Sequence, residues 1–263
     1  MKTSKEAGMK PVEIAKGIYS VGVTDWNIRD FHGYSTDSGT SYNSFLIVDE
    51  KKVLVDTVKK EFSDQHLNNI RQIMDPSEID IVISNHSEMD HSGSLPGLMN
   101  VIGKDKPVYC SKMGKRALTD HFGSGLNLKD VEHSGEMSIG KRTLRFLETR
   151  MLHWPDSMFT YVKEDGILFS SDAFGQHFAS TKTWVDQVGE SAVIPHAKKY
   201  FANILLPFAP KILKLIEDLK TMDLNLSMIC PDHGMLWRDN PGQAIDLYEK
   251  WSLQKPSKKA VVL

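Results

Sequence analysis

The chain has 263 residues, of which 40% are hydrophobic and 25% charged, and its 32 Lys and Arg nearly balance its 34 Asp and Glu. This composition is typical of a globular protein with enough apolar residues for a large core. The net charge of −2 and the lack of a basic run argue against nucleic acid as a partner. No apolar stretch has the length of a signal peptide or a membrane span, which predicts a cytoplasmic protein without a membrane partner.

Short runs of β-branched and aromatic residues precede and alternate with stretches of helical spacing. The predicted strands are Phe45–Val48, Val53–Val55, Ile79–Ile83, Val108–Tyr109, Thr143–Leu147, Ile167–Phe169 and Leu226–Ile229. The predicted helices are Phe62–Met74, Lys112–Phe122, Ala197–Leu205, Pro210–Met222 and Gly242–Leu253. This mixture predicts an α/β fold in which helices pack outside β-sheets, with residues 1–254 forming one domain.

The most specific feature is His86-Ser-Glu-Met-Asp-His91, which follows the apolar run at 79–83. An apolar strand that leads into clustered His and carboxylate side chains indicates a metal site at the edge of a sheet. If the segment is extended, His86 and Glu88 share one side, and the alternation separates them from Asp90 with His91. The cluster can therefore serve two ions rather than one.

Three further candidate ligands follow strand-like runs or lie in turns, namely His153, Asp172 and His233. Together with the first cluster they make seven ligands for two ions, which leaves open coordination positions that a structural site would not keep. The carboxylates of Glu88, Asp90 and Asp172 would balance two divalent ions and one bridging hydroxide, whereas trivalent ions would favour a bridging oxo group. A carboxylate among histidines also favours iron, although ligand softness alone leaves manganese and zinc open.

In these motifs the chain resembles the diiron domain of the flavodiiron proteins, which belong to the metallo-β-lactamase superfamily. The resemblance covers nearly the whole chain, and it rests on segments 25–34, 86–91, 153–158, 171–177, 200–205 and 233–238. It implies a metallo-β-lactamase-like αββα sandwich that holds two Fe ions. One iron would be held by His86, Glu88 and His153 and the other by Asp90, His91 and His233, with Asp172 bridging the two.

The resemblance implies roles for three more residues near the irons. His32, His177 and Tyr200 fall on positions from which they would donate hydrogen bonds to bound oxygen species, although packing explains Tyr200 equally well. Zinc hydrolases of the superfamily carry His where Glu88 stands, so Glu88 argues against a hydrolase, which is the third function considered.

Flavodiiron proteins continue into a flavodoxin domain, and residues 255–263 resemble the first strand of that domain. No glycine-rich phosphate loop follows, so no FMN site is expected within this chain. An iron pair without an internal electron donor is expected to bind O2, or NO, as a sensor or carrier in signalling such as chemotaxis in an anaerobe. The alternative is a flavodiiron-type O2 or NO reductase that receives electrons from a separate redox partner. The resemblance also implies a homodimer.

Overall fold

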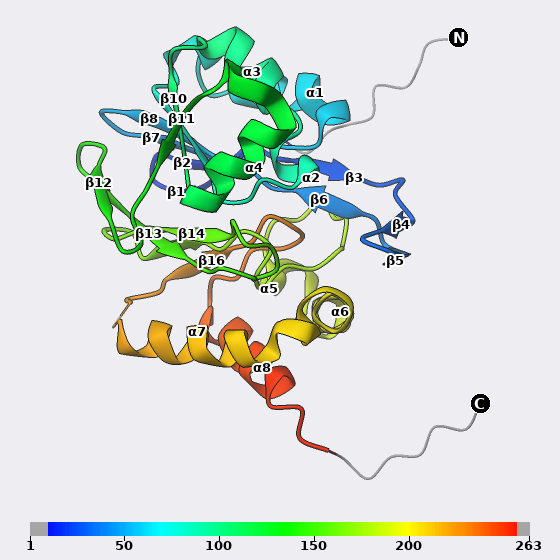
Figure 1. The fold of residues 1–263 in the computed structure, drawn as a ribbon. Helices are drawn as coiled ribbons and strands as arrows, with labels where there is room; N and C mark the ends of the chain where they lie inside the picture. Colours follow the sequence, from blue (N-terminus) through cyan, green and yellow to red (C-terminus); the bar gives the residue numbers. More distant parts are fainter. Residues whose placement is uncertain (1–9, 223, 257–263) are drawn as a thin grey trace, which may run out of the picture.

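Two β-sheets pack face to face in the computed structural model of this chain, and helices cover both outer faces (Figure 1). The structure describes residues 10–222 and 224–256. The arrangement confirms the predicted αββα sandwich. The part of the tail at 257–263 that was compared with a flavodoxin strand lies outside the described residues.

The larger sheet has the order β1-β2-β7-β8-β9-β10-β11. Its strands are β1 (Val12–Ala15), β2 (Ile18–Ser20), β7 (Phe45–Val48), β8 (Lys52–Val55), β9 (Ile81–Ser84), β10 (Pro107–Cys110) and β11 (Asn127–Asp130). The smaller sheet has the order β12 (Glu136–Ser138), β13 (Thr143–Glu148), β14 (Met158–Val162), β15 (Ile167–Phe169) and β16 (Met228–Cys230). Two hairpin-like pairs stand apart, formed by β3 (Val23–Asp25) with β6 (Thr40–Tyr42) and by β4 (Asp30–Phe31) with β5 (Tyr34–Ser35).

The long helices form two outer layers, each with its own apolar face on a sheet. The first layer contains α1 (Ser63–Arg71), α3 (Leu95–Ile102) and α4 (Lys112–Phe122), and the second contains α6 (Glu190–Tyr200), α7 (Ala209–Thr221) and α8 (Gly242–Ser252). Two single-turn helices, α2 (Met89–Ser92) and α5 (Val185–Val188), lie in connections. Among the described residues, no helix is long and apolar enough to cross a membrane.

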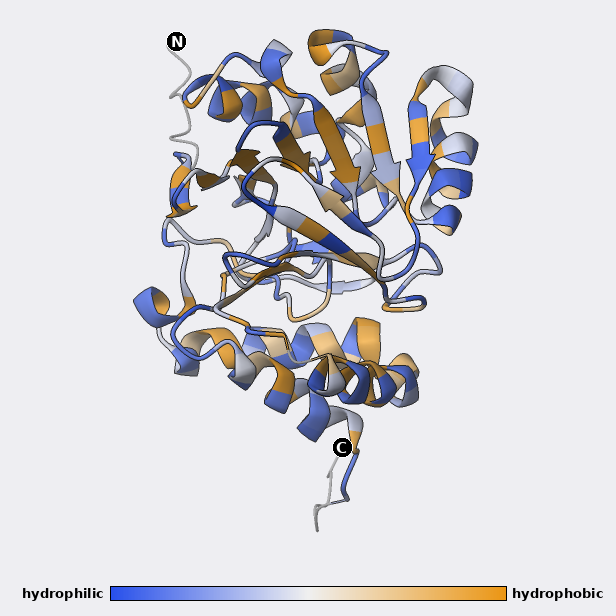
Figure 2. Cartoon of the chain, turned by 90° about the vertical axis from the view of Figure 1, so that its left-hand side faces the viewer, coloured by the Kyte–Doolittle hydropathy of each residue, from blue (hydrophilic) through white to orange (hydrophobic). Residues whose placement is uncertain are grey.

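Apolar side chains between the sheets form the central core. Phe45 of β7 and Phe169 of β15 meet there with ring centroids 4.7 Å apart, so the two sheets are in direct contact. Figure 2 shows the apolar residues concentrated on the strands, whereas the helices carry apolar and polar stripes. Removing this apolar surface from water is the main driving force that holds the four layers together.

Parallel pairing brings several strand ends to the same edge of the sandwich. In the larger sheet β8, β9 and β10 run parallel, and in the smaller sheet β15 runs parallel to β16. A hydrogen bond of 2.8 Å from the Asp232 amide to the Ser171 carbonyl joins the segments after β15 and β16. Loops that leave parallel strands at their carboxyl ends are the usual place for binding groups in α/β folds.

Several details differ from the prediction. Strand β9 begins at Ile81 rather than Ile79. Strands β1 to β6, β11, β12 and β14 were not predicted, because most are too short to show a hydrophobic period. Helix α6 begins at Glu190, before the predicted start at Ala197, and it ends at Tyr200, where a π-helical turn follows at Phe201–Leu205. The extended geometry assumed for 86–91 is wrong at its end, because α2 begins at Met89.

Candidate metal centre

The candidate ligands lie where the two sheets present their strand ends. His86 and Glu88 follow β9, and the single turn of α2 then carries Asp90 and His91 back toward them. Two more ligands come from the smaller sheet, with Asp172 after β15 and His233 after β16. His153 lies between β13 and β14, which meet at the same edge. All seven predicted side chains therefore converge.

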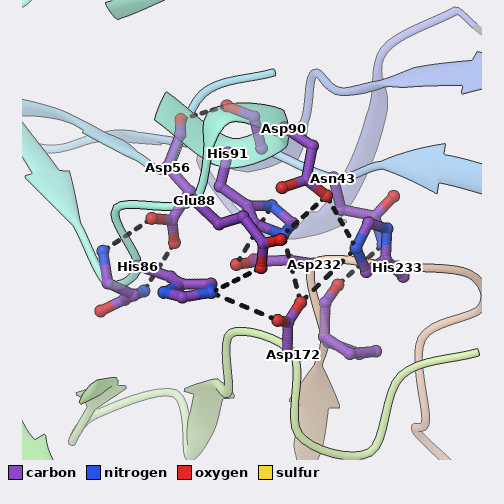
Figure 3. A network of polar contacts seen from close by, with 12 residues as sticks. Asn43, Asp56, His86, Glu88, Asp90, His91, Asp172, Asp232 and His233 are labelled. Atoms are coloured by element: carbon purple, nitrogen blue, oxygen red, sulfur yellow. Dashed lines mark hydrogen bonds and ion pairs between the residues drawn. The ribbon is translucent and has the colours of Figure 1, made fainter. Parts of the chain in front are cut away.

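One group of ligand atoms surrounds the Oδ2 atom of Asp172. His153 Nε2 lies 2.9 Å from that oxygen and His86 Nε2 lies 3.5 Å from it. The Oε2 atom of Glu88 is 3.2 Å from both imidazole nitrogens. His86, Glu88, His153 and Asp172 thus offer four ligand atoms that could hold one ion. We call this group the first subsite; Figure 3 shows three of its side chains pointing at one another.

A second group surrounds the other oxygen of the same carboxylate. His91 Nε2 lies 3.1 Å and His233 Nε2 lies 3.5 Å from Asp172 Oδ1. The Oδ2 atom of Asp90 is 3.2 Å from His91 Nε2 and 3.1 Å from His233 Nε2. Asp90, His91, Asp172 and His233 form the second subsite. Because the two oxygens of Asp172 face different subsites, this carboxylate is placed to bridge two ions.

Unpaired buried atoms point to a group that fills the centre. Among the described residues, Asp90 Oδ1 and Oδ2, His91 Nε2, Asp172 Oδ1 and His233 Nε2 are buried without a hydrogen-bond partner. Buried polar atoms that lack partners cost free energy, so native proteins rarely keep several together. Metal ions would satisfy these lone pairs, and carboxylates with imidazoles suit a divalent transition metal. The residues present therefore fit a dinuclear centre.

The protonation behaviour of the metal-free centre agrees with this fit. Burial raises the pKa of Asp172, but the nearby imidazoles of His91 and His153 outweigh burial and hold it well below its usual value. Conversely, burial lowers the pKa of His153, while Asp172 and Glu88 outweigh burial and raise it to about 9. Without metal, protons on the histidines offset the charge of the carboxylates. Metal ions would replace those protons, because a metal binds the deprotonated imidazole.

Three ligand histidines have an acceptor near the second ring nitrogen. His86 Nδ1 lies 3.1 Å from Asp156 Oδ2, and His233 Nδ1 lies 2.7 Å from the Ser41 carbonyl oxygen. His91 Nδ1 faces Asp232 Oδ2 at the longer distance of 3.7 Å. An acceptor on the outer nitrogen turns the inner nitrogen toward a metal and is typical of ligand histidines.

Asp156 and Asp232 lie beside candidate ligand histidines, and the sequence predicted no role for either. Both are buried and both lie within motifs that contain a predicted ligand, Asp156 three residues after His153 and Asp232 just before His233. A carboxylate next to a ligand in a turn was the available signal. The partner of each carboxylate could not be predicted from the sequence. His86 lies 70 residues before Asp156, and His91 lies 141 residues before Asp232.

The three residues expected near the irons do lie beside the centre. His32 Nε2 is 3.5 Å from Glu88 Oε1, and His177 Nε2 is 3.2 Å from His32 Nδ1. The Tyr200 ring is 5.0 Å from the His177 ring, and its buried hydroxyl has no partner among the described residues. Their position is consistent with the expected role of these residues as hydrogen-bond donors, which stays a prediction.

Comparison with known proteins places this geometry in a family. The sequence model described as "ODP family beta lactamase" matches residues 40–234. A nitric oxide reductase of Moorella thermoacetica is 43% identical over 256 residues, which cover 96% of this chain and 64% of that protein. The chain therefore spans about two thirds of the length of that relative.

Solved structures agree with the sequence match. Rubredoxin oxygen:oxidoreductase from the anaerobe Desulfovibrio gigas superposes with a TM-score of 0.92 at 39% identity, over 94% of this chain and 63% of that one. The flavodiiron protein of Giardia intestinalis superposes with a TM-score of 0.88 at 39% identity, over 92% of this chain and 59% of that one. The chain belongs to the ODP family of β-lactamase-type proteins, and it corresponds to the metallo-β-lactamase-like domain of the flavodiiron proteins.

Proposed function

We propose that this chain holds two iron ions and reacts with O2 or NO at the position between them. The observation that carries the proposal is the division of Asp172, whose two oxygens face two separate sets of His and carboxylate ligands. His86, Glu88 and His153 would hold one iron, and Asp90, His91 and His233 the other. When bound by these residues, two irons would supply electrons to O2 or NO.

Glu88 supports iron over zinc in this proposal. Its Oε2 atom lies 3.2 Å from the nitrogens of both His86 and His153, where a carboxylate would stabilise a more highly charged ion. Among the three candidate functions, hydrolysis by a zinc-bound hydroxide is the one that this carboxylate opposes.

Reduction of O2 or NO is the function best supported by the relatives. Two of them are named as a nitric oxide reductase and as a rubredoxin oxygen:oxidoreductase. Because the matched part is about two thirds of those proteins, the activity of the whole relatives is not carried over to this chain. Electrons would come from a separate redox partner or domain, and the chain would act as a homodimer in the cytoplasm.

The experiment measures turnover. Protein loaded anaerobically with two Fe(II) per chain is mixed with O2 or NO in the presence of a reduced rubredoxin. Reductase function predicts many equivalents of gas consumed per centre. A stoichiometric, long-lived optical change without further consumption would contradict it, and would instead indicate the sensor or carrier function that the sequence analysis expected.

Replacing Glu88 tests the choice of metal. Loading Glu88→His from an equimolar mixture of Fe(II) and Zn(II) should raise the zinc content relative to the wild type, because a neutral nitrogen replaces an anionic oxygen. Metal analysis by mass spectrometry gives the ratio. An unchanged iron content in the variant would mean that Glu88 does not select iron.

A further inference from the structure

We propose that His32 is a fifth histidine ligand of the centre, which completes the second subsite in the reduced protein. The inference rests on the proposed dinuclear centre and assigns His32 a bond to a metal ion rather than a hydrogen bond to a bound gas. O2 or NO would then have to displace this side chain before binding between the ions.

Distances to both subsites support this assignment. His32 Nε2 lies 4.0 Å from Asp90 Oδ2 and 3.5 Å from Glu88 Oε1, so it stands between a ligand of each subsite. The ligand atoms of His32, Asp90 and His233 all lie within 4.8 Å of one another. Ligands about 2.1 Å from one ion are about 3 Å apart when adjacent and about 4.2 Å apart when opposite, so the 4.0 Å between His32 Nε2 and Asp90 Oδ2 fits opposite positions on one ion.

The nitrogen itself is free to bind. His32 Nε2 is buried and has no hydrogen-bond partner among the described residues. The side chain is 10% exposed, so water does not readily compensate this nitrogen. A buried ring nitrogen that lacks a partner and faces carboxylate ligands is better satisfied by a cation than left empty.

A chain of hydrogen bonds is compatible with a proton on Nδ1 of His32. The Thr40 hydroxyl donates to the Ser41 carbonyl oxygen at 3.3 Å, because a carbonyl can only accept. Thr40 Oγ1 can then accept from His177 Nδ1, which lies 2.8 Å away. In a neutral His177 ring the other nitrogen, Nε2, must accept, and the donor 3.2 Å from it is His32 Nδ1.

The consequence is a lone pair on His32 Nε2 that faces the centre. In the His32 tautomer that carries its proton on Nδ1, the Nε2 atom offers a lone pair. The pattern of an outer donor and an inner lone pair is the one that ligand histidines show.

The backbone also aims His32 at the centre. His32 and Gly33 form the turn between β4 and β5, with φ values of 54° and 77°. Two positive φ angles are typical of a type I′ hairpin turn, where Asn and Gly are favoured and His is among the residues that tolerate a positive φ. The Phe31 ring stacks on the imidazole with centroids 4.0 Å apart, which fixes its orientation. A non-glycine residue held at a positive φ is consistent with a functional site.

Counting coordinated imidazoles tests the proposal. In protein loaded anaerobically with two Fe(II) per chain, each coordinated histidine contributes an exchangeable N–H resonance shifted by the paramagnetic ion in the proton NMR spectrum. We expect His32→Gly to lose one such resonance, because the variant keeps a favourable turn sequence while it removes the ring. Added imidazole should restore the resonance. His121→Gln, on the exposed side of α4, is the matched control and should lose none.

Metal affinity provides a second readout. In competition with a chelator, the ion of the second subsite should bind about 10-fold or more weakly in His32→Gly and in His32→Asn, a second turn-compatible variant. An unchanged count of shifted resonances with unchanged affinity would overturn the proposal. If the wild-type protein nevertheless binds two irons and consumes O2 or NO, the proposed function stands without His32 as a ligand. If the wild-type protein fails to bind iron, both the proposed function and the role of His32 are contradicted.

Discussion

The two subsites share Asp172 but differ in exposure and in how their histidines are supported. In the first subsite the side chains of Glu88 and His153 are 21% and 13% exposed. In the second subsite Asp90 is 4% exposed and His91 is fully buried. The first subsite is therefore open to a partner or solvent, whereas the second depends on its ions and its surroundings for charge balance.

The carboxylates beside the outer ring nitrogens of His86 and His91, namely Asp156 and Asp232, also differ between the two subsites. Although burial raises the pKa of Asp156, the imidazole of His86 and the Ser87 amide lower it below its usual value, so this carboxylate is charged. Burial and the neighbouring Asp56 raise the pKa of Asp232 well above its usual value, so this group keeps its proton more readily than Asp156 does. A charged acceptor 3.1 Å from His86 should strengthen a ligand more than a neutral one 3.7 Å from His91.

Removing the shared carboxylate should have the largest effect, because it weakens both subsites at once. Asp172→Asn replaces an anionic bridge with a neutral amide, and we expect the iron content to fall from two ions per chain to fewer than about one. Metal analysis after dialysis against a chelator measures this, with the exposed Asp120→Asn as control. Loss of only one ion would show that the subsites bind independently.

Asp156→Asn should weaken the first subsite selectively. Loss of the charged acceptor for His86 is expected to lower metal affinity about 10–100-fold, the range typical of residues that orient ligands. Chelator competition with Co(II), whose optical spectrum distinguishes the two ions, reports each affinity separately. An equal loss in both subsites would contradict the comparison.

Asp232→Asn should have a smaller effect, below about threefold on the second subsite, because the amide has the shape of the neutral acid. The same Co(II) competition measures it. If this variant weakened metal binding as much as Asp156→Asn, Asp232 would have to be charged in the loaded protein and closer to His91 than 3.7 Å.

The metal-free protein should lose stability as the pH rises. The pKa of His153 is about 9 in the folded chain against 6.5 in the unfolded chain, so its protonation stabilises the fold fully below pH 6.5. This contribution is lost as the pH rises through about 9. We expect the Tm to fall by about 2–4 °C for each kcal/mol of unfolding free energy that is lost. In His153→Gln the Tm should fall less steeply with pH. A metal-free Tm that rises over this interval would contradict the assignment.

Some of the strands and helices and the candidate ligand residues could be predicted because both depend on local patterns. The fully buried strand β9 reads as a continuous apolar run, and helix α4 begins at Lys112 and ends at Phe122 as predicted. The seven candidate ligands were recognisable because His and carboxylate residues cluster after such runs, and because the motifs resemble a known family. Family resemblance, rather than spacing, assigned each ligand to an ion.

Contacts between distant segments were decided only by the tertiary structure. The prediction of an extended segment at 86–91 failed because α2 turns Asp90 and His91 back toward the sheet edge. Asp172 meets them at that edge, although 80 residues separate His91 from Asp172 in the sequence. The same limit applied to Asp156, whose bond to His86 forms only when the two sheets pack together. The sequence by itself determined which chemical groups are available, because residue types and local periods are written in it. The folded chain determined which of their atoms meet, because distances across a sandwich depend on packing and not on spacing along the chain.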